Sequence, residues 1–291
     1  MSPARLSSFV FLLLVGCGGA LPAPVTPTPV AAQPAVAVFP GTFLDAQDRV
    51  VPPAEVLARL EAARVVYVGE LHDSPDSHAL ELAVIRALSD RDPSVAVGLE
   101  MVQRPFQAGL DDYIAGRTSE AQLLTAIEWA ARWGFTFDLY RAIFKLARAR
   151  HLPLRALNAR MELTRRIGRE GLAALTPAET AELPEMDAND PAHRALVLSM
   201  LGDHPGLDDA MRERFYQAQL VWDETMATEV ARALSAPDAP RHLVVLAGTG
   251  HVRAGLGIPK RAARRAPAAF VTVLPASECE AASDADLRWR P

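Results

Sequence analysis

Two apolar runs in this chain each end in a glycine that is followed, three positions later, by a histidine. Gly69–His72 (Gly-Glu-Leu-His) follows the run Val65–Val68, and Gly248–His251 (Gly-Thr-Gly-His) follows Leu243–Ala247. Runs of this kind are typical of strands that are buried on both faces of a parallel sheet. Ligands of such sheets gather at the carboxyl ends of the strands. The two motifs therefore predict that two imidazoles meet at one edge of an α/β sheet.

Carboxylates accompany these histidines. Glu70 lies inside the first motif, and a third apolar run, Val95–Leu99, ends in Glu100. Two imidazoles and one or two carboxylates can form a metal site or an acid–base pair. We therefore expect Glu70, His72, Glu100 and His251 to be catalytic, with His72, Glu100 and His251 as the ligands if a divalent metal is present. The pattern is short, and a chance match among 7 histidines and 17 glycines stays open as the alternative.

The apolar runs alternate with helical patterns, which indicates an α/β fold with a mostly parallel sheet covered by helices. The predicted strands are Val65–Val68, Val95–Leu99, Leu152–Leu157, Leu243–Ala247 and Phe270–Leu274. The predicted helices are His78–Ser89, Glu120–Trp133, Asp138–Arg150, Glu162–Ala174 and residues 208–234. The helical content between the third and fourth strands is too large for one crossover. We therefore expect a helical lobe inserted between about residues 158 and 240.

Several polar residues have competing interpretations. We expect Asp76 or Ser77 to cap the helix at 78–89, which leaves His78 at the surface. On the long helix, Trp222 is expected in the core, whereas Asp223 can reach the strand-end site. A basic cluster follows Pro259 and comprises Lys260, Arg261, Arg264 and Arg265. It is either a solvated helix face or a site for propionates or anionic lipid head groups.

The N-terminus is a targeting segment rather than part of the fold. Arg5 precedes a short apolar stretch, Phe9–Val15, and Leu14–Cys17 is similar to a bacterial lipobox. We predict a lipoprotein signal over residues 1–17 with Cys17 lipidated; a secretory signal with an incidental cysteine is the alternative. Residues 18–35 are rich in Pro and Ala and read as a linker. Residues 36–277 form the α/β domain, and residues 278–291 a C-terminal tail.

Composition limits the kind of partner. The net charge is −5, and half of the residues are hydrophobic. A mildly acidic chain of this kind does not favour nucleic acid as a partner. The only other cysteine is Cys279, so lipidation of Cys17 leaves no intrachain disulfide.

Four motifs together resemble a known family. They are Gly-Glu-Leu-His-Asp (69–73), Gly-Leu-Glu-Met (98–101), Ala-Gln-Leu-Val-Trp-Asp-Glu-Thr-Met-Ala (218–227) and Gly-Thr-Gly-His-Val (248–252). In this order, and after a lipoprotein start, they resemble the ChaN-like haem-binding uptake lipoproteins. That family belongs to the Tiki/erythromycin-esterase/TraB superfamily. The resemblance runs from about residue 65 to residue 259.

The resemblance implies a lipid-anchored, haem-binding protein of iron uptake or storage. It implies a place in the cell envelope, at the outer membrane facing the periplasm. It also implies a homodimer enclosing haem and an outer-membrane haem receptor as a partner. A tyrosine ligand from the lobe is implied, for which Tyr216 is the candidate, with His204 near it. The superfamily pattern at His72, Glu100 and His251 implies instead a hydrolase, with a divalent metal or with His/Glu acid–base chemistry. Both functions remain open at this point.

Overall fold

The computed structural model describes residues 38–202 and 206–291. The predicted signal at 1–17 with Cys17, the linker at 18–35 and the candidate haem residue His204 lie outside these residues. In the described ranges, no helix has both the length and the apolar character needed to cross a membrane.

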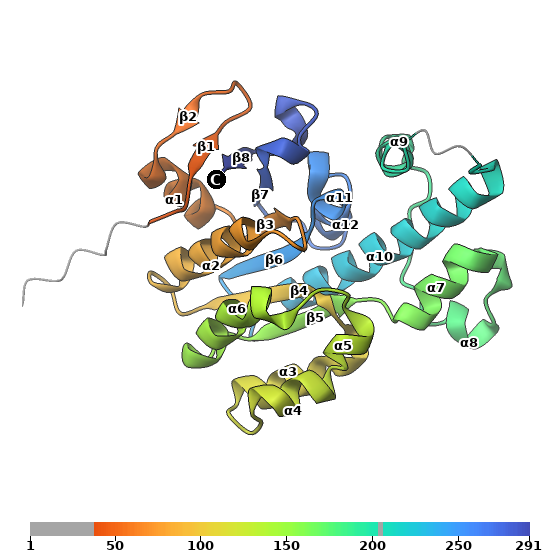
Figure 1. Ribbon diagram of the computed structural model, residues 1–291, viewed down its shortest axis with the longest axis horizontal. Helices are drawn as coiled ribbons and strands as arrows, with labels where there is room; N and C mark the ends of the chain where they lie inside the picture. Colours follow the sequence, from red (N-terminus) through yellow and green to blue (C-terminus); the bar gives the residue numbers. More distant parts are fainter. Residues whose placement is uncertain (1–37, 203–205) are drawn as a thin grey trace, which may run out of the picture. The chain divides into compact units, whose positions relative to one another are not determined.

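One eight-stranded sheet organises the chain (Figure 1), in the order β2-β1-β8-β7-β3-β6-β4-β5. The strands are β1 (Thr42–Leu44), β2 (Val50–Val51), β3 (Val65–Glu70), β4 (Val95–Gln103), β5 (Leu154–Asn158), β6 (His242–Gly248), β7 (Phe270–Pro275) and β8 (Leu287–Arg290). The six strands from β8 to β5 are parallel to their neighbours, and β1 pairs antiparallel with both β8 and β2. The predicted mostly parallel α/β sheet is confirmed.

All five predicted strands are present as β3 to β7, but three strands were missed. Residues 278–291, predicted as a tail, supply β8, which pairs with β7 and β1. The strands β1 and β2 are only three and two residues long. Strands of this length show no periodic pattern in the sequence, so they can be identified only from the strands with which they pair.

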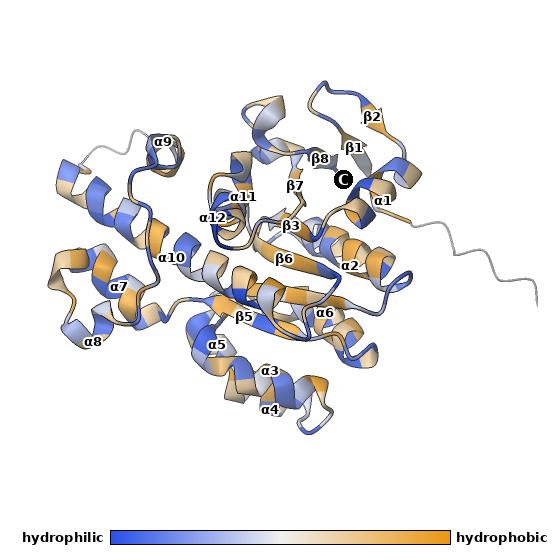
Figure 2. Cartoon of the chain, turned by 180° about the vertical axis from the view of Figure 1, so that it is seen from behind, coloured by the Kyte–Doolittle hydropathy of each residue, from blue (hydrophilic) through white to orange (hydrophobic). Residues whose placement is uncertain are grey.

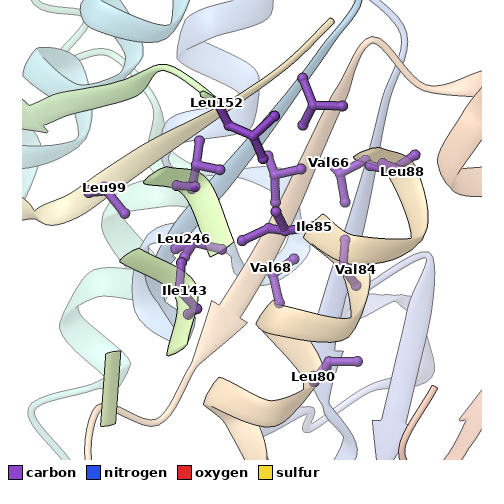
Figure 3. Packing of buried hydrophobic residues seen from close by; sticks show 14 of the residues in the cluster. Val66, Val68, Leu80, Val84, Ile85, Leu88, Leu99, Ile143, Leu152 and Leu246 are labelled. Carbon is purple, nitrogen blue, oxygen red and sulfur yellow. The ribbon is translucent and has the colours of Figure 1, made fainter. Parts of the chain in front are cut away.

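Side chains of the central strands alternate between two cores. On β3, Val66 and Val68 pack on the face covered by α1 (Pro53–Ala62), α2 (Pro75–Ser89) and α6 (Phe137–Ala149). Figure 3 shows these valines among Leu80, Val84 and Ile85 of α2. The alternate residues Val65 and Tyr67 pack on the other face, against α10 (Asp209–Ser235) and α12 (Ile258–Arg265). Burial on both faces explains why these strands are continuously apolar.

The structure corrects three helix boundaries. α2 begins at Pro75, and its N-cap is Ser74, whose side chain accepts the N–H of Ser77; neither Asp76 nor Ser77 is the cap. α6 begins at Phe137, one residue before the predicted start at Asp138, and its N-cap is Thr136. The predicted helix at 120–133 is divided into α4 (Glu120–Ala126) and α5 (Trp129–Arg132), because Glu128 between them adopts a left-handed conformation.

The helices between β5 and β6 are α7 (Met161–Glu170), η2 (Leu172–Ala174), α8 (Pro177–Thr180), α9 (Pro191–Ser199) and α10. The C-terminal half of α10 packs on the sheet through Met226 and Val230. Its N-terminal half extends beyond the sheet (Figures 1 and 2), where Val221 packs on α7 and Leu220 on α9. Two small apolar clusters therefore hold this helical lobe to α10.

The remaining elements are η1 (Arg104–Phe106), α3 (Gln107–Ile114), α11 (Thr249–Val252), η3 (Arg253–Gly255), η4 (Ala276–Glu278) and η5 (Ala282–Asp284). The short helix α11 follows β6 directly and carries His251.

Candidate functional site

Strand register brings the predicted residues to one edge of the sheet. Glu70 at the end of β3 lies opposite Gly248 at the end of β6. On the other side of β6, Leu99 of β4 lies opposite Leu246, which places Glu100 next to the same strand end. His72, Glu100 and His251 line one cleft of about 290 Å³. The structure thus assembles the residues of both Gly-x-x-His motifs, as the sequence predicted.

His72 is held in place by a buried carboxylate. Its Nδ1 lies 2.7 Å from Oε1 of Glu70, and its ring rests edge-on against Trp133 at 4.9 Å between centroids. A Cβ at position 248 would lie 2.9 Å from Cε1 of His72, so only glycine leaves room for the ring there. The structure gives Nε2 no hydrogen-bond partner among the described residues, so this nitrogen is the one offered to the cleft.

His251 lies between two carboxylates. Its Nδ1 is 2.6 Å from Oδ1 of Asp223, and its Nε2 is 3.3 Å from Oε1 of Glu100. The other oxygen of Glu100 accepts the backbone N–H of Gly248 at 2.6 Å. Burial lowers the pKa of His251, but the charges of Glu100 and Asp223 outweigh it and raise this pKa to about 10. His251 is therefore an imidazolium at neutral pH.

The other two cleft groups also favour their charged forms. Burial lowers the pKa of His72, but its hydrogen bond to Glu70 and the charge of Glu100 raise it above the ordinary value. Burial raises the pKa of Glu100, but the charge and hydrogen bond of His251 bring it below its usual range. At neutral pH the cleft therefore holds an ion pair between the imidazolium of His251 and the carboxylate of Glu100.

A hydrogen-bonded chain continues from His251 into the lobe. The second oxygen of Asp223 lies 2.8 Å from Nε2 of His193 on α9. The guanidinium of Arg261 lies 2.9 Å from the other ring nitrogen of His193. Because an arginine can only donate, His193 carries its proton on Nε2 and donates it to Asp223. Asp223 therefore accepts from two histidines, with its side chain fully buried.

A second buried chain lies behind His72. Tyr140 donates to Oε1 of Glu70 at 2.8 Å, and Trp133 donates to the Tyr140 hydroxyl at 3.2 Å. His78 is 4 % exposed, so the expectation that it lies at the surface is wrong. It contacts Glu81 of the same helix, whose pKa is raised by burial and by the neighbouring Glu70 carboxylate.

An apolar groove of about 390 Å³ adjoins the cleft and shares two lining residues with it, Thr164 and Trp222. Its walls come from α7, α10 and the segment between α9 and α10. The other lining residues are Arg165, Gly168, Leu201, Leu207, Met211, Phe215 and Ala218. Trp222, predicted in the core, instead separates the polar cleft from the apolar groove.

Tyr216, the candidate haem ligand, does not line this groove. It is 2 % exposed, its hydroxyl points to the carbonyl of Ala188 at 3.5 Å, and the Arg194 guanidinium covers its ring. All four tyrosines of the sequence are buried, at 0–2 % exposure. A haem could reach the Tyr216 hydroxyl only after a movement of α9.

The basic cluster after Pro259 is a solvated helix face only in part, since Lys260 and Arg264 are exposed whereas Arg261 is not. Arg261 is buried and pairs with Glu224 at 3.2 Å, and Arg265 pairs with the same carboxylate at 2.6 Å. Lys260 pairs with Asp190 at 2.7 Å. These cations therefore join α12 to α10 and to the lobe, which leaves little of their charge for an anionic ligand.

The donor set of the cleft suits a divalent metal. In metal sites, a ligating histidine characteristically donates its other ring N–H to a carboxylate. His72 has this arrangement with Glu70, and His251 has it with Asp223. Glu100 would supply the carboxylate ligand of a His₂Glu set. The ligand atoms of His72, Glu100 and His251 do not all lie within 4.8 Å of one another, so the geometry supports an acid–base pair, and a metal would require these side chains to move closer together.

Comparison with known proteins gives the family. A family model described as "Haem-binding uptake, Tiki superfamily, ChaN" matches residues 56–262. This chain belongs to the ChaN family of the Tiki superfamily. A ChaN structure from Campylobacter jejuni, described as showing cofacial haem binding, matches 86 % of this chain and 97 % of its own at a TM-score of 0.70 and 16 % identity. The erythromycin esterase EreC, in a mutant form, matches 80 % of this chain and 76 % of its own, at a TM-score of 0.47 and 16 % identity. No curated protein sequence matches this chain.

Several site residues of this ChaN family member were not predicted. Glu81 sits in the apolar stripe of α2, next to Leu80 and one turn before Val84 and Ile85, and a carboxylate in that stripe was the available signal. His193 and Gln219, which also approach the buried network, carry no comparable signal. Asp223 was predicted to reach the cleft, but its role as the carboxylate partner of His251 was not.

Proposed function

We propose that this chain binds haem as cargo, in the apolar groove beside the strand-end cleft. The observation that carries the proposal is this groove, about 390 Å³ and lined mainly by aliphatic and aromatic side chains, in a member of a haem-binding family. A porphyrin needs mostly apolar contact with a few polar anchors. Arg165 in the groove wall offers a cation for a propionate.

Met211 is the soft iron ligand that the groove supplies. It is 42 % exposed and lines the groove, whereas Tyr216 is enclosed behind α9. A methionine thioether is an established axial ligand of haem iron. We propose that a second copy of the chain covers the face of the haem that this groove does not contact. A lipid anchor at Cys17, a place at the outer membrane facing the periplasm and transfer from a haem receptor complete the proposed role in iron uptake.

A hemin titration of the full chain tests this function. We expect a saturable Soret shift that Met211→Leu alters and Tyr216→Phe leaves unchanged. Met200→Leu is the matched control, because Met200 is similarly exposed, at 38 %, but does not line the groove. A Soret shift altered by Tyr216→Phe alone would return the ligand role to Tyr216. The absence of any saturable shift in the unaltered chain would refute haem binding.

The strand-end cleft favours a second candidate function, hydrolysis. His72 offers a free Nε2 to a water in the cleft, while Glu70 orients the ring and receives the Nδ1 proton's hydrogen bond. A general base positioned in this way typically contributes 10²–10⁴-fold to rate. A divalent metal held by His72, Glu100 and His251 would instead lower the pKa of its bound water towards neutrality.

An esterase assay with p-nitrophenyl acetate separates this function from haem binding. If the cleft is catalytic, His72→Gln abolishes hydrolysis while the hemin titration is unchanged. Addition of a chelator then distinguishes metal chemistry from acid–base chemistry. Activity that survives both His72→Gln and His251→Asn would exclude the cleft as the catalytic site.

A further inference from the structure

Behind the cleft, three side chains converge in the protein interior, and only one of them, Glu70, has a part in a proposed function, where one of its oxygens orients His72. Glu70 ends β3, and His78 and Glu81 lie on α2. They are 1 %, 4 % and 0 % exposed. One ligand atom from each lies within 4.8 Å of the other two, and no other His, Cys, Asp or Glu group in the described part of the chain meets this spacing.

The hydrogen bonds of His78 fix which nitrogen carries its proton. Nε2 lies 3.1 Å from the backbone carbonyl of His72, which can only accept, so Nε2 donates. In neutral His78, Nδ1 therefore presents a lone pair. That lone pair faces Oε2 of Glu81 at 2.9 Å and Oε2 of Glu70 at 3.4 Å. Three acceptors thus point at one another.

Tyr140 and His72 contact only Oε1 of Glu70, so within the described ranges the oxygens that face the centre of the cluster have no partner other than His78. Oε2 of Glu70 and Oε1 of Glu81 have no hydrogen-bond partner, and in the described residues the ion-pair partners of Glu70 and Glu81 are histidines alone. Burying a charged carboxylate without a partner destabilises the folded state by about several kcal/mol. A cation at the centre of the cluster, or a proton shared between the two carboxylates, would remove this cost.

We propose that a cation is present, and that it is a divalent transition-metal ion bound by Nδ1 of His78 and the carboxylates of Glu70 and Glu81. With metal–ligand bonds of about 2.0–2.2 Å, ligand atoms around such an ion are separated by roughly 2.9–3.5 Å. The observed separations of 2.9 and 3.4 Å fall in this range. The unpartnered Oε1 of Glu81 can supply a fourth ligand by bidentate binding.

The ligand types select the class of ion. One imidazole and two carboxylates suit zinc, iron(II) or manganese(II). Calcium takes six to eight oxygen ligands and magnesium keeps several waters, which this fully buried cluster cannot provide. The ion would sit behind the cleft and would hold Glu70, whose other oxygen orients His72. The site is therefore distinct from the haem groove and from the cleft, but it would support the cleft geometry.

A cobalt(II) titration of the chelator-treated full chain tests the proposal. We expect about one equivalent of cobalt(II) to bind, with visible d–d absorption, and the midpoint of thermal unfolding to rise. Glu81→Gln should weaken cobalt(II) binding by about 100-fold or more, since it removes a ligand carboxylate. The matched control is Asp76→Asn on the same helix, which removes an exposed carboxylate and should bind as the unaltered chain does.

The double variant His72→Ala/His251→Asn removes the two histidines of the cleft, so any cobalt(II) that it binds reports on the buried site. This second test does not depend on whether Glu81→Gln folds. One equivalent of cobalt(II) in this double variant supports the buried site, and its loss overturns the proposal. Glu81→Gln is also an isostere of protonated glutamic acid. If it binds cobalt(II) as the unaltered chain does and unfolds at the same or a higher temperature, a shared proton occupies the cluster and the metal site is refuted.

Discussion

The strand-end cleft and the apolar groove share Trp222 and Thr164 but are built on opposite principles. The cleft is a network of ionisable groups in which His72 is fixed by Glu70 of the same motif, and His251 by Asp223 and Glu100 from two other elements. The groove is lined by side chains from two helices and a connecting segment, with few polar groups to fix a ligand. The cleft is thus suited to directed chemistry, and the groove to holding a flat apolar molecule.

This contrast shows that the two proposed functions would use different parts of the chain and need not compete. The cleft depends on sheet register and on α10, whereas the groove depends on the lobe helices. If the two regions are independent, changes in one should leave the other intact. The predictions below test that independence, beginning with the largest expected effect.

Asp223→Asn should have the largest effect, because it removes the carboxylate shared by two buried histidines. Breaking a buried pair in this way costs about 3–5 kcal/mol of the free energy of unfolding. Chemical denaturation measures this loss, while hemin affinity in the groove should be unchanged for the folded protein. Asp238→Asn is the control, since Asp238 is 80 % exposed and its pairing with Arg155 is loose, at 3.7 Å. Equal stability of the two variants would show that Asp223 does not hold the network.

The imidazolium of His251 should give stability a characteristic dependence on pH. Its pKa is about 10 in the folded chain and about 6.5 in an unfolded chain. The stabilisation is therefore complete below pH 6.5 and is lost as the pH rises towards 10, amounting to a few kcal/mol. Denaturation of the unaltered chain and of His251→Gln between pH 6 and 10 measures it as a difference. A difference that stays constant over this range would contradict the assignment, and a parallel change in hemin affinity would break the independence of the two regions.

The smallest effect is expected in the groove. Gly168→Glu places a carboxylate in the groove wall, where position 168 has open space for a side chain. Hemin affinity should fall about tenfold, or roughly 1.4 kcal/mol. Arg169→Glu changes the charge more but lies outside the groove lining, so it should retain the affinity. If the control loses affinity to the same extent, charge alone governs hemin binding and the groove is not its site.

The sequence was most informative for the buried strands and for the residues directly after them, because the geometry of a parallel sheet places the ends of such strands at one edge. The apolar runs predicted β3 to β7, and the two Gly-x-x-His motifs predicted the meeting of His72 with His251. Parallel pairing makes such an inference possible, because strand ends meet at one edge whatever their separation in sequence.

The parts that were missed depend on contacts that no local pattern contains. His78 was placed at the surface because α2 was taken to begin three residues late, past the Ser74 cap and Pro75. The role of Asp223 follows from the docking of α10 against α11, which brings it to His251 across 28 positions of the chain. The ligation role of Tyr216 remains a prediction that the present geometry does not favour.

The position of β8 has a consequence for the order of assembly. Thr42 of β1 pairs with Arg290 of β8, and β8 also pairs with β7. The N-terminal hairpin of β1 and β2 can therefore join the sheet only after residues 287–290 have been synthesised and placed. Contacts between segments so far apart slow folding, because a long loop must close before they form. Until then β7 presents an unpaired edge, the kind that recruits other chains, so this edge is where the incompletely folded chain is most exposed to aggregation.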